Sequence, residues 1–98
     1  MSQSDILLIE DNPDDAELTR IAFAQASIGH QLVVVRDGAE ALDYLFARGP
    51  HAGRDPLQLP AIVLLDLNLP KLDGREVLRA IKNDPELRCI PVIVLTRR

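Results

Sequence analysis

Four short runs of aliphatic residues set the strongest limit on what this chain can fold into. Each run is rich in Ile, Leu and Val and has no internal polar alternation; the runs are Ile6–Ile9, Leu32–Val35, Ile62–Leu65 and Val92–Leu95. Such runs are typical of strands that are covered on both faces, as in a parallel sheet. We therefore expect four buried strands.

The stretches between these runs have helix start signals. Asn12 is suited to cap a first helix, whose inward face we expect to carry Leu18, Ile21 and Ala22. Asp37 opens a capping box for a second helix, which we expect to run through Phe46.

Gly49 is the expected stop of that second helix. A third helix is expected after the Asp73 capping box and ends before Asp84-Pro85. The resulting order, βαβαβαβ, is the pattern of a doubly wound parallel α/β sheet. Three helices for four strands leave part of the sheet without cover.

The segment from Gly49 to Pro60 is longer than a typical connection of this kind and rich in Gly and Pro. We interpret it as a surface excursion that is either structurally idle or a partner contact, and the idle role is favoured because loops tolerate insertions.

Composition excludes several classes of protein. The 98 residues form one domain at most, with 47% hydrophobic and 27% charged residues, as in a soluble globular protein. A net charge of −4 argues against direct nucleic-acid binding, and no apolar segment is long enough to span a membrane. The single cysteine, Cys89, is expected to be a small buried side chain. A cytoplasmic location fits all of these features.

Acidic residues follow two of the four apolar runs. Glu10 and Asp11 follow the first, Asp66 follows the third, and Thr96 follows the fourth. Ligands of open parallel sheets bind outside the carboxyl ends of the strands, so these residues converge if the first and third strands are neighbours. Clustered carboxylates repel one another unless a cation is present, and Mg²⁺ is the natural candidate.

Helix capping is the competing explanation for acidic residues after a strand. It is the better explanation for Asp14 and Asp15. For Asp11 and Asp66 together the metal site is favoured, while Glu10 acts through water or only sets the local field. A carboxylate beside such a metal can attack phosphorus and form an acyl phosphate.

Three stretches resemble the signature motifs of two-component response-regulator receiver domains. They are ILLIEDNP at 6–13, VLLDLNLPKLDG at 63–74 and PVIVLT at 91–96. The resemblance implies a flavodoxin-like sheet, here of about four strands in the order 2-1-3-4 with three helices. The long segment from Gly49 to Pro60 and the residues of the second motif also resemble those of receivers that serve bacterial phytochromes.

The resemblance also implies a role for each site residue. Asp66 would be the phosphoacceptor and Thr96 the switch hydroxyl that moves toward the phosphoryl group. Asp11 and Asp66 would ligate Mg²⁺, with the backbone carbonyl of Asn68, and Glu10 would assist through water. The donor would be a sensor histidine kinase or a phosphotransfer protein, with a bacteriophytochrome as one candidate.

Two features depart from the family pattern. Arg97 stands where a small residue is usual. The family pattern also continues through a fourth helix, a fifth strand that carries a phosphoryl-binding lysine, and a fifth helix, and nothing after Arg98 matches them. We therefore expect residues 1–98 to form a receiver domain that is incomplete at its C-terminus.

Other functions remain open at this point. Receivers catalyse only their own phosphorylation and slow dephosphorylation. A small phosphohydrolase of the haloacid-dehalogenase type is a less favoured alternative, because it would need a second carboxylate at position 68, where this chain has Asn68. The fragment could instead be a non-phosphorylated interaction module or half of a swapped dimer. A homodimer through the apolar fourth run is a further hypothesis, because uncovered edge strands pair readily.

Overall fold

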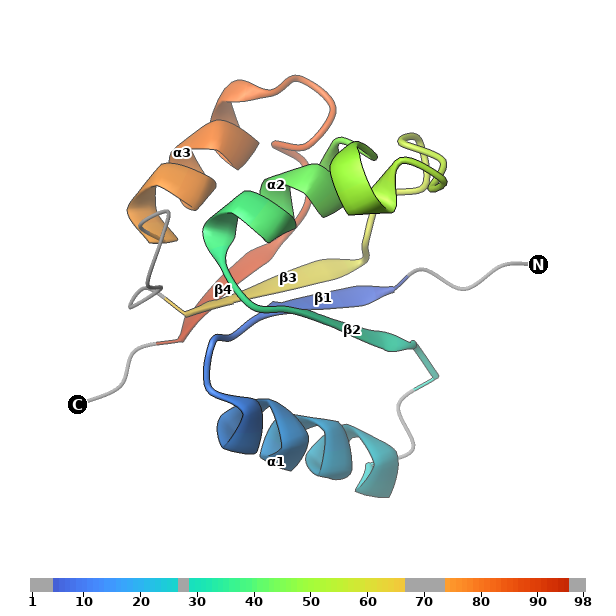
Figure 1. The fold of residues 1–98 in the computed structure, drawn as a ribbon, viewed down its shortest axis with the longest axis vertical. Helices are drawn as coiled ribbons and strands as arrows, with labels where there is room; N and C mark the ends of the chain where they lie inside the picture. Colours follow the sequence, from blue (N-terminus) through green and yellow to red (C-terminus); the bar gives the residue numbers. More distant parts are fainter. Residues whose placement is uncertain (1–4, 27–28, 67–73, 96–98) are drawn as a thin grey trace.

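In the computed structural model, four parallel strands lie between helices on two sides (Figure 1). The structure describes residues 5–26, 29–66 and 74–95. The elements in chain order are β1 (Ile6–Ile9), α1 (Pro13–Gln25), β2 (Leu32–Val35), α2 (Gly38–Leu45), the 3-10 helix η1 (Gly49–His51), β3 (Ile62–Asp66), α3 (Gly74–Asn83) and β4 (Val92–Leu95). The sheet has the order β2-β1-β3-β4, which confirms the predicted flavodoxin-like arrangement.

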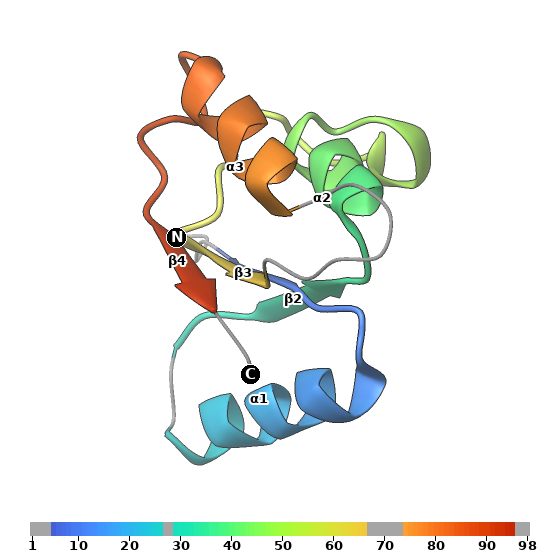
Figure 2. The ribbon, with the colours of Figure 1, turned by 90° about the vertical axis from the view of Figure 1, so that its left-hand side faces the viewer.

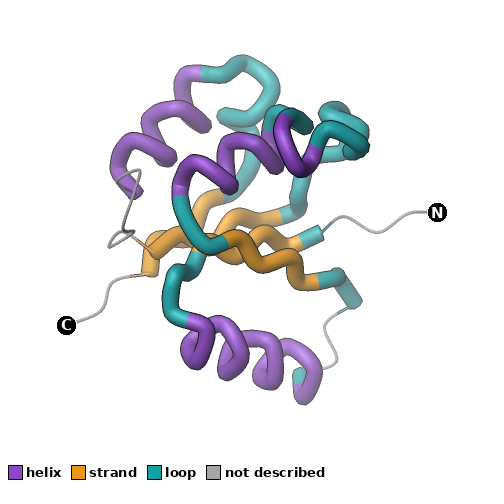
Figure 3. The backbone as a smooth tube through the Cα atoms, in the orientation of Figure 1, coloured by secondary structure: helices purple, strands orange, loops and turns teal. Residues whose placement is uncertain are grey.

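The two faces of the sheet are covered unequally. Helices α2 and α3 lie on one face and α1 on the other, as the two ribbon views and the tube show (Figures 1, 2 and 3). Side chains of β1 alternate between them, because successive residues of a strand point to opposite faces. Leu7 and Ile9 join the core under α2 and α3, and Ile6 and Leu8 join the smaller cluster under α1.

The inward face predicted for the first helix is wrong. Ala16 is the buried residue of α1, while Leu18 is 64% exposed, Ile21 is 44% exposed and Ala22 is exposed. Among the described helices α1 alone lies on its face of the sheet, so no neighbouring helix covers Leu18 and Ile21. The predicted face rested on the hydrophobicity of these residues alone.

The second helix ends earlier than predicted. Its last residue is Leu45, Phe46 is the C-cap, and Ala47 adopts the left-handed conformation at φ 54°. Gly49 begins η1 instead of stopping α2. Cys89 is exposed rather than buried, because it lies in the turn before β4 and not in a strand or helix.

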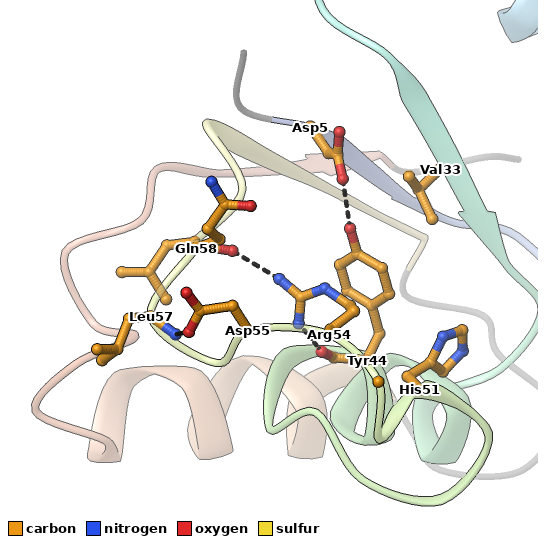
Figure 4. A pocket seen from close by; sticks show the side chains of 10 residues that line it. Asp5, Val33, Tyr44, His51, Arg54, Asp55, Leu57 and Gln58 are labelled. Carbon is orange, nitrogen blue, oxygen red and sulfur yellow. Dashed lines mark hydrogen bonds between the residues drawn. The ribbon is translucent and has the colours of Figure 1, made fainter. Parts of the chain in front are cut away.

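The long segment after α2 is anchored to the body of the domain rather than idle. The guanidinium of Arg54 lies 4.0 Å from the centroid of the Tyr44 ring and donates hydrogen bonds to the carbonyl oxygens of Tyr44 and Gln58 (Figure 4). The segment thereby encloses one side of an open cavity of about 660 Å³, with Asp5 and His51 in its lining. The core residue Tyr44 is therefore also the attachment point of this segment.

Candidate functional site

The candidate site lies where β1 and β3 end side by side. The two strands pair in parallel, with Ile9 opposite Leu65, so the next residues, Glu10 and Asp66, lie at the same level. Asp66 is the last residue of β3 and pairs across with Leu95 of β4. The carboxyl edge of the sheet therefore brings Glu10 and Asp66 together, as the sequence predicted.

Glu10 is held in place by the backbone on both sides of it. Its N–H donates a hydrogen bond of 2.9 Å to the carbonyl oxygen of Val35, which continues the β1–β2 ladder past the end of the strand. Its Oε2 accepts a hydrogen bond of 3.2 Å from the N–H of Asn12. The carboxylate is thereby fixed at the turn into α1.

Asn12 starts α1 as predicted and fixes the chain that carries Asp11. Its Oδ1 accepts hydrogen bonds from the N–H groups of Asp14 and Asp15, at 2.8 and 3.3 Å. Asp14 and Asp15 lie in the first turn of the helix, where negative charge is favourable. The capping role expected for these two residues is confirmed, and they lie outside the acidic cluster.

The acidic cluster consists of Glu10, Asp11 and Asp66. One carboxylate oxygen from each residue lies within 4.8 Å of the other two. Glu10 is 6% exposed and Asp66 is fully buried, while Asp11 is the most exposed of the three. Three carboxylates at such distances repel one another, so a bound cation would stabilise the arrangement.

The donor set fits a hard divalent metal ion. All three ligand groups are carboxylates, and oxygen ligands of this kind suit Mg²⁺, Ca²⁺ and Mn²⁺ better than softer metals. Two of the three are buried, so a bound cation would be poorly screened by water and would interact strongly with them. The predicted residues Asn68 and Thr96 lie outside the described residues.

A family model for the response regulator receiver domain matches residues 6–98. The chain belongs to this family. Receiver domains are the signalling modules of two-component systems, and they bind divalent metal ions. The predicted family and fold are thus confirmed, and the acidic cluster is a candidate site for a divalent metal ion.

Three relatives illustrate the similarity of this receiver to known proteins. The response regulator Rcp1 of Synechocystis sp. is 45% identical over 91 residues, which cover 93% of the chain and 60% of Rcp1. A structure of Rcp1 in its Mn²⁺-bound form matches with a TM-score of 0.88 and 43% identity, over 98% of the chain and 67% of that structure. The receiver therefore spans less than two thirds of the curated Rcp1 sequence.

The other two relatives are response regulators of phytochromes. The bacteriophytochrome response regulator AtBRR matches with a TM-score of 0.93 and 50% identity, over 100% of the chain and 69% of that structure. The phosphorylated cyanobacterial phytochrome response regulator RcpA matches with a TM-score of 0.87 and 47% identity, over 99% of the chain and 67% of that structure.

The sequence did not reveal a second polar cluster at the opposite end of the receiver. The hydroxyl of Tyr44 donates a hydrogen bond to Asp5, and Arg54 lies over the same ring (Figure 4). Burial and the hydrogen bond to Asp5 raise the pKa of Tyr44 to about 12, although Arg54 acts in the opposite direction. Asp5 is 39 residues from Tyr44 in the sequence, and no motif links the three residues.

Within the described residues, no helix is long and apolar enough to cross a membrane. This finding agrees with the sequence, in which the apolar runs are strands of four or five residues.

Proposed function

We propose that Asp66 accepts a phosphoryl group from a phosphohistidine, in a reaction that depends on Mg²⁺ held by the acidic cluster. The observation that carries the proposal is the fully buried carboxylate of Asp66, which lies within 4.8 Å of carboxylate oxygens of Glu10 and Asp11. Asp11 and Asp66 would be direct ligands, and Glu10 would act through water.

The chemistry is a transfer between two covalent carriers. A carboxylate oxygen of Asp66 forms a bond to phosphorus, and the bond from phosphorus to the donor nitrogen breaks, which leaves the imidazole with the electron pair. When bound, Mg²⁺ supplies positive charge beside the phosphoryl oxygens. The burial of Asp66 limits the access of water to the acyl phosphate, so we expect slow self-dephosphorylation and no steady turnover.

The roles of Asn68 and Thr96 rest on the family resemblance. Asn68 would contribute its backbone carbonyl to the metal, and the Thr96 hydroxyl would bond a phosphoryl oxygen. Leu95, which immediately precedes Thr96, pairs with Asp66, and this pairing supports the assignment. Movement of Thr96 would switch a protein-interaction surface.

The proposed donor is a sensor histidine kinase or a phosphotransfer protein in the cytoplasm. Similarity to AtBRR and to RcpA favours a kinase of the bacteriophytochrome type. A net charge of −4 supports a protein partner rather than direct contact with nucleic acid.

Strand β4 supports a homodimer as an additional assembly. Ile93 is 48% exposed and Val94 is 39% exposed, so the strand presents apolar side chains at the edge of the described sheet. A second copy would bury them. Sedimentation at increasing protein concentration tests this, and a monomer throughout the range would exclude it.

The phosphoryl acceptor is tested by intact-protein mass after incubation with acetyl phosphate. We expect one phosphoryl adduct that requires Mg²⁺ and is absent in Asp66→Asn. Asp14→Asn is the matched control, because it removes a nearby carboxylate outside the acidic cluster and should leave the adduct unchanged. An adduct that persists in Asp66→Asn would exclude Asp66 as the acceptor.

A further inference from the structure

Arg36 lies in one row with two residues of the acidic cluster. Val35 of β2, Ile9 of β1 and Leu65 of β3 are in register. The next residues along the three strands, Arg36, Glu10 and Asp66, therefore lie at the same level. Adjacent strands are about 4.8 Å apart, which places the backbone of Arg36 about 10 Å from that of Asp66, with Glu10 between them.

This row faces the α1 side of the sheet. Val34 packs into the cluster under α1, and Arg36 follows it by two residues, so strand alternation directs both to the same side. A cavity of about 380 Å³ opens there, and its lining includes Glu10, Asp11 and Arg36. The cavity therefore adjoins the acidic cluster from the β2 side.

The backbone of Arg36 is held at the edge of this cavity. Its N–H donates a hydrogen bond of 3.1 Å to Oε1 of Glu40. Glu40 in turn belongs to the capping box of α2, in which its own N–H donates a hydrogen bond of 2.8 Å to Oδ1 of Asp37. The position of Arg36 is thus set by the start of α2, while its side chain remains exposed at the cavity.

The guanidinium of Arg36 forms no ion pair with a described residue. No described carboxylate lies within ion-pair distance of its guanidinium, although Glu40 contacts its backbone. Arg20, which lines the same cavity, has Glu17 as a partner at 3.7 Å. Arg36 is therefore the cation of this cavity that is available to an anionic ligand.

We propose that Arg36 binds the departing carboxylate when an acyl phosphate donates its phosphoryl group to Asp66. This proposal rests on the proposed role of Asp66 as the acceptor. In an in-line displacement the leaving group lies on the side of phosphorus away from the attacking oxygen. A donor that lies on the β2 side of Asp66 would place its leaving group toward the cavity that Arg36 lines.

The transfer from an acyl phosphate releases an anion, and this is why the positive charge of Arg36 affects the step. A carboxylate oxygen of Asp66 forms the new bond to phosphorus, and the bond from phosphorus to the acyl oxygen breaks. The electron pair stays on that oxygen, so acetate leaves as an anion that a guanidinium binds through two N–H groups. Phosphoramidate, in contrast, loses neutral ammonia, which gains nothing from a neighbouring cation.

The test compares these two donors on the same proteins. Initial rates of adduct formation are measured by intact-protein mass, in Mg²⁺ and over a range of donor concentrations, for the wild type, Arg36→Ala and Arg36→Lys. Arg88→Ala is the control, because Arg88 is an exposed arginine that precedes β4, at the opposite end of the sheet. Thermal unfolding of each variant verifies that it is folded.

We expect Arg36→Ala to lower the second-order rate constant for acetyl phosphate by about tenfold, and that for phosphoramidate by less than about twofold. Arg36→Lys should recover part of the loss, and Arg88→Ala should react like the wild type with both donors. If Arg36→Ala lowered the rate constants for the two donors equally, or did not lower the rate constant for acetyl phosphate, the role of Arg36 would be overturned. Failure of the wild type to react with either donor would instead overturn the proposed function of Asp66, and this inference with it.

Discussion

The hydroxyl of Tyr44 donates a hydrogen bond of 2.7 Å to Oδ2 of Asp5 and so joins α2 to the residue before β1. Tyr44 is 4% exposed. Its ring also contacts Arg54 and His51, which belong to the segment that follows α2. Tyr44 therefore connects three parts of the chain at the end of the sheet away from the acidic cluster.

The ionisation of Tyr44 provides a direct test of this arrangement. Its pKa is raised to about 12, first by burial and then by the hydrogen bond to Asp5. Tyr44 is the only tyrosine, so the ultraviolet absorbance of tyrosinate reports on it alone. We expect a midpoint near pH 12 in the native protein and a lower one in Asp5→Asn. A midpoint near pH 10, with native circular dichroism retained, would contradict the buried hydrogen bond.

The same pKa predicts how stability depends on pH. Because the folded-state pKa is raised, the protonated hydroxyl stabilises the native state fully below pH 10, and this contribution is lost as pH rises toward 12. At neutral pH we expect Tyr44→Phe to lower the free energy of unfolding by about 1 kcal/mol, the usual value of one hydrogen bond. Urea unfolding should show the wild type and Tyr44→Phe converging between pH 10 and 12, whereas a constant difference would exclude the linkage.

Arg54 is expected to hold the segment after α2 in place. Arg54→Ala removes the contact with the Tyr44 ring and the hydrogen bonds to two carbonyl oxygens, so we expect a loss of about 1–2 kcal/mol in the free energy of unfolding. Arg48→Ala is the matched control. Arg48 lies 5.1 Å from the Phe46 ring and 3.0 Å from Asp43, but its side chain is 58% exposed, so its loss should be below about 0.5 kcal/mol. Similar losses in the two variants would contradict an anchoring role for Arg54.

The end of α2 offers a stabilising substitution. Ala47 has a φ of 54°, a conformation that costs a residue with a Cβ roughly 1 kcal/mol and that glycine adopts readily. We expect Ala47→Gly to raise the free energy of unfolding by up to about 1 kcal/mol. Ala52→Gly is the control, because Ala52 has a φ of −62° and the change should only destabilise. Thermal or urea unfolding measures both, and destabilisation by both would show that Ala47 is not strained.

The parts of the fold that the sequence predicted are those with a local signal. The apolar runs predicted all four strands, and the capping residues Asn12 and Asp37 predicted the starts of two helices. The position of Glu10 beside Asp66 followed from the rule that ligands of parallel sheets gather at the carboxyl ends of the strands.

The parts that the sequence did not predict depend on tertiary neighbours. The exposure of Leu18 and Ile21 reflects what packs beside α1, and hydrophobicity carries no information about that. Tyr44 contacts Asp5, which is 39 residues away, and the contact depends on how β1 and α2 pack. The row that joins Arg36 to Asp66 likewise required the register of three strands.

The acidic cluster should make the stability of the protein depend on a divalent metal ion. Without metal, the repulsion among the three carboxylates opposes folding, so Asp66→Asn should raise the free energy of unfolding in a chelator by an amount on the order of 1 kcal/mol. Added Mg²⁺ should raise the melting temperature of the wild type, because a ligand that binds only the native state stabilises it. The Mg²⁺-dependent rise in melting temperature should be much smaller in Asp11→Asn than in the wild type. It should be the same as in the wild type in Asp14→Asn, whose carboxylate is outside the cluster. A Mg²⁺-dependent shift of equal size in Asp11→Asn and the wild type would show that the metal binds elsewhere.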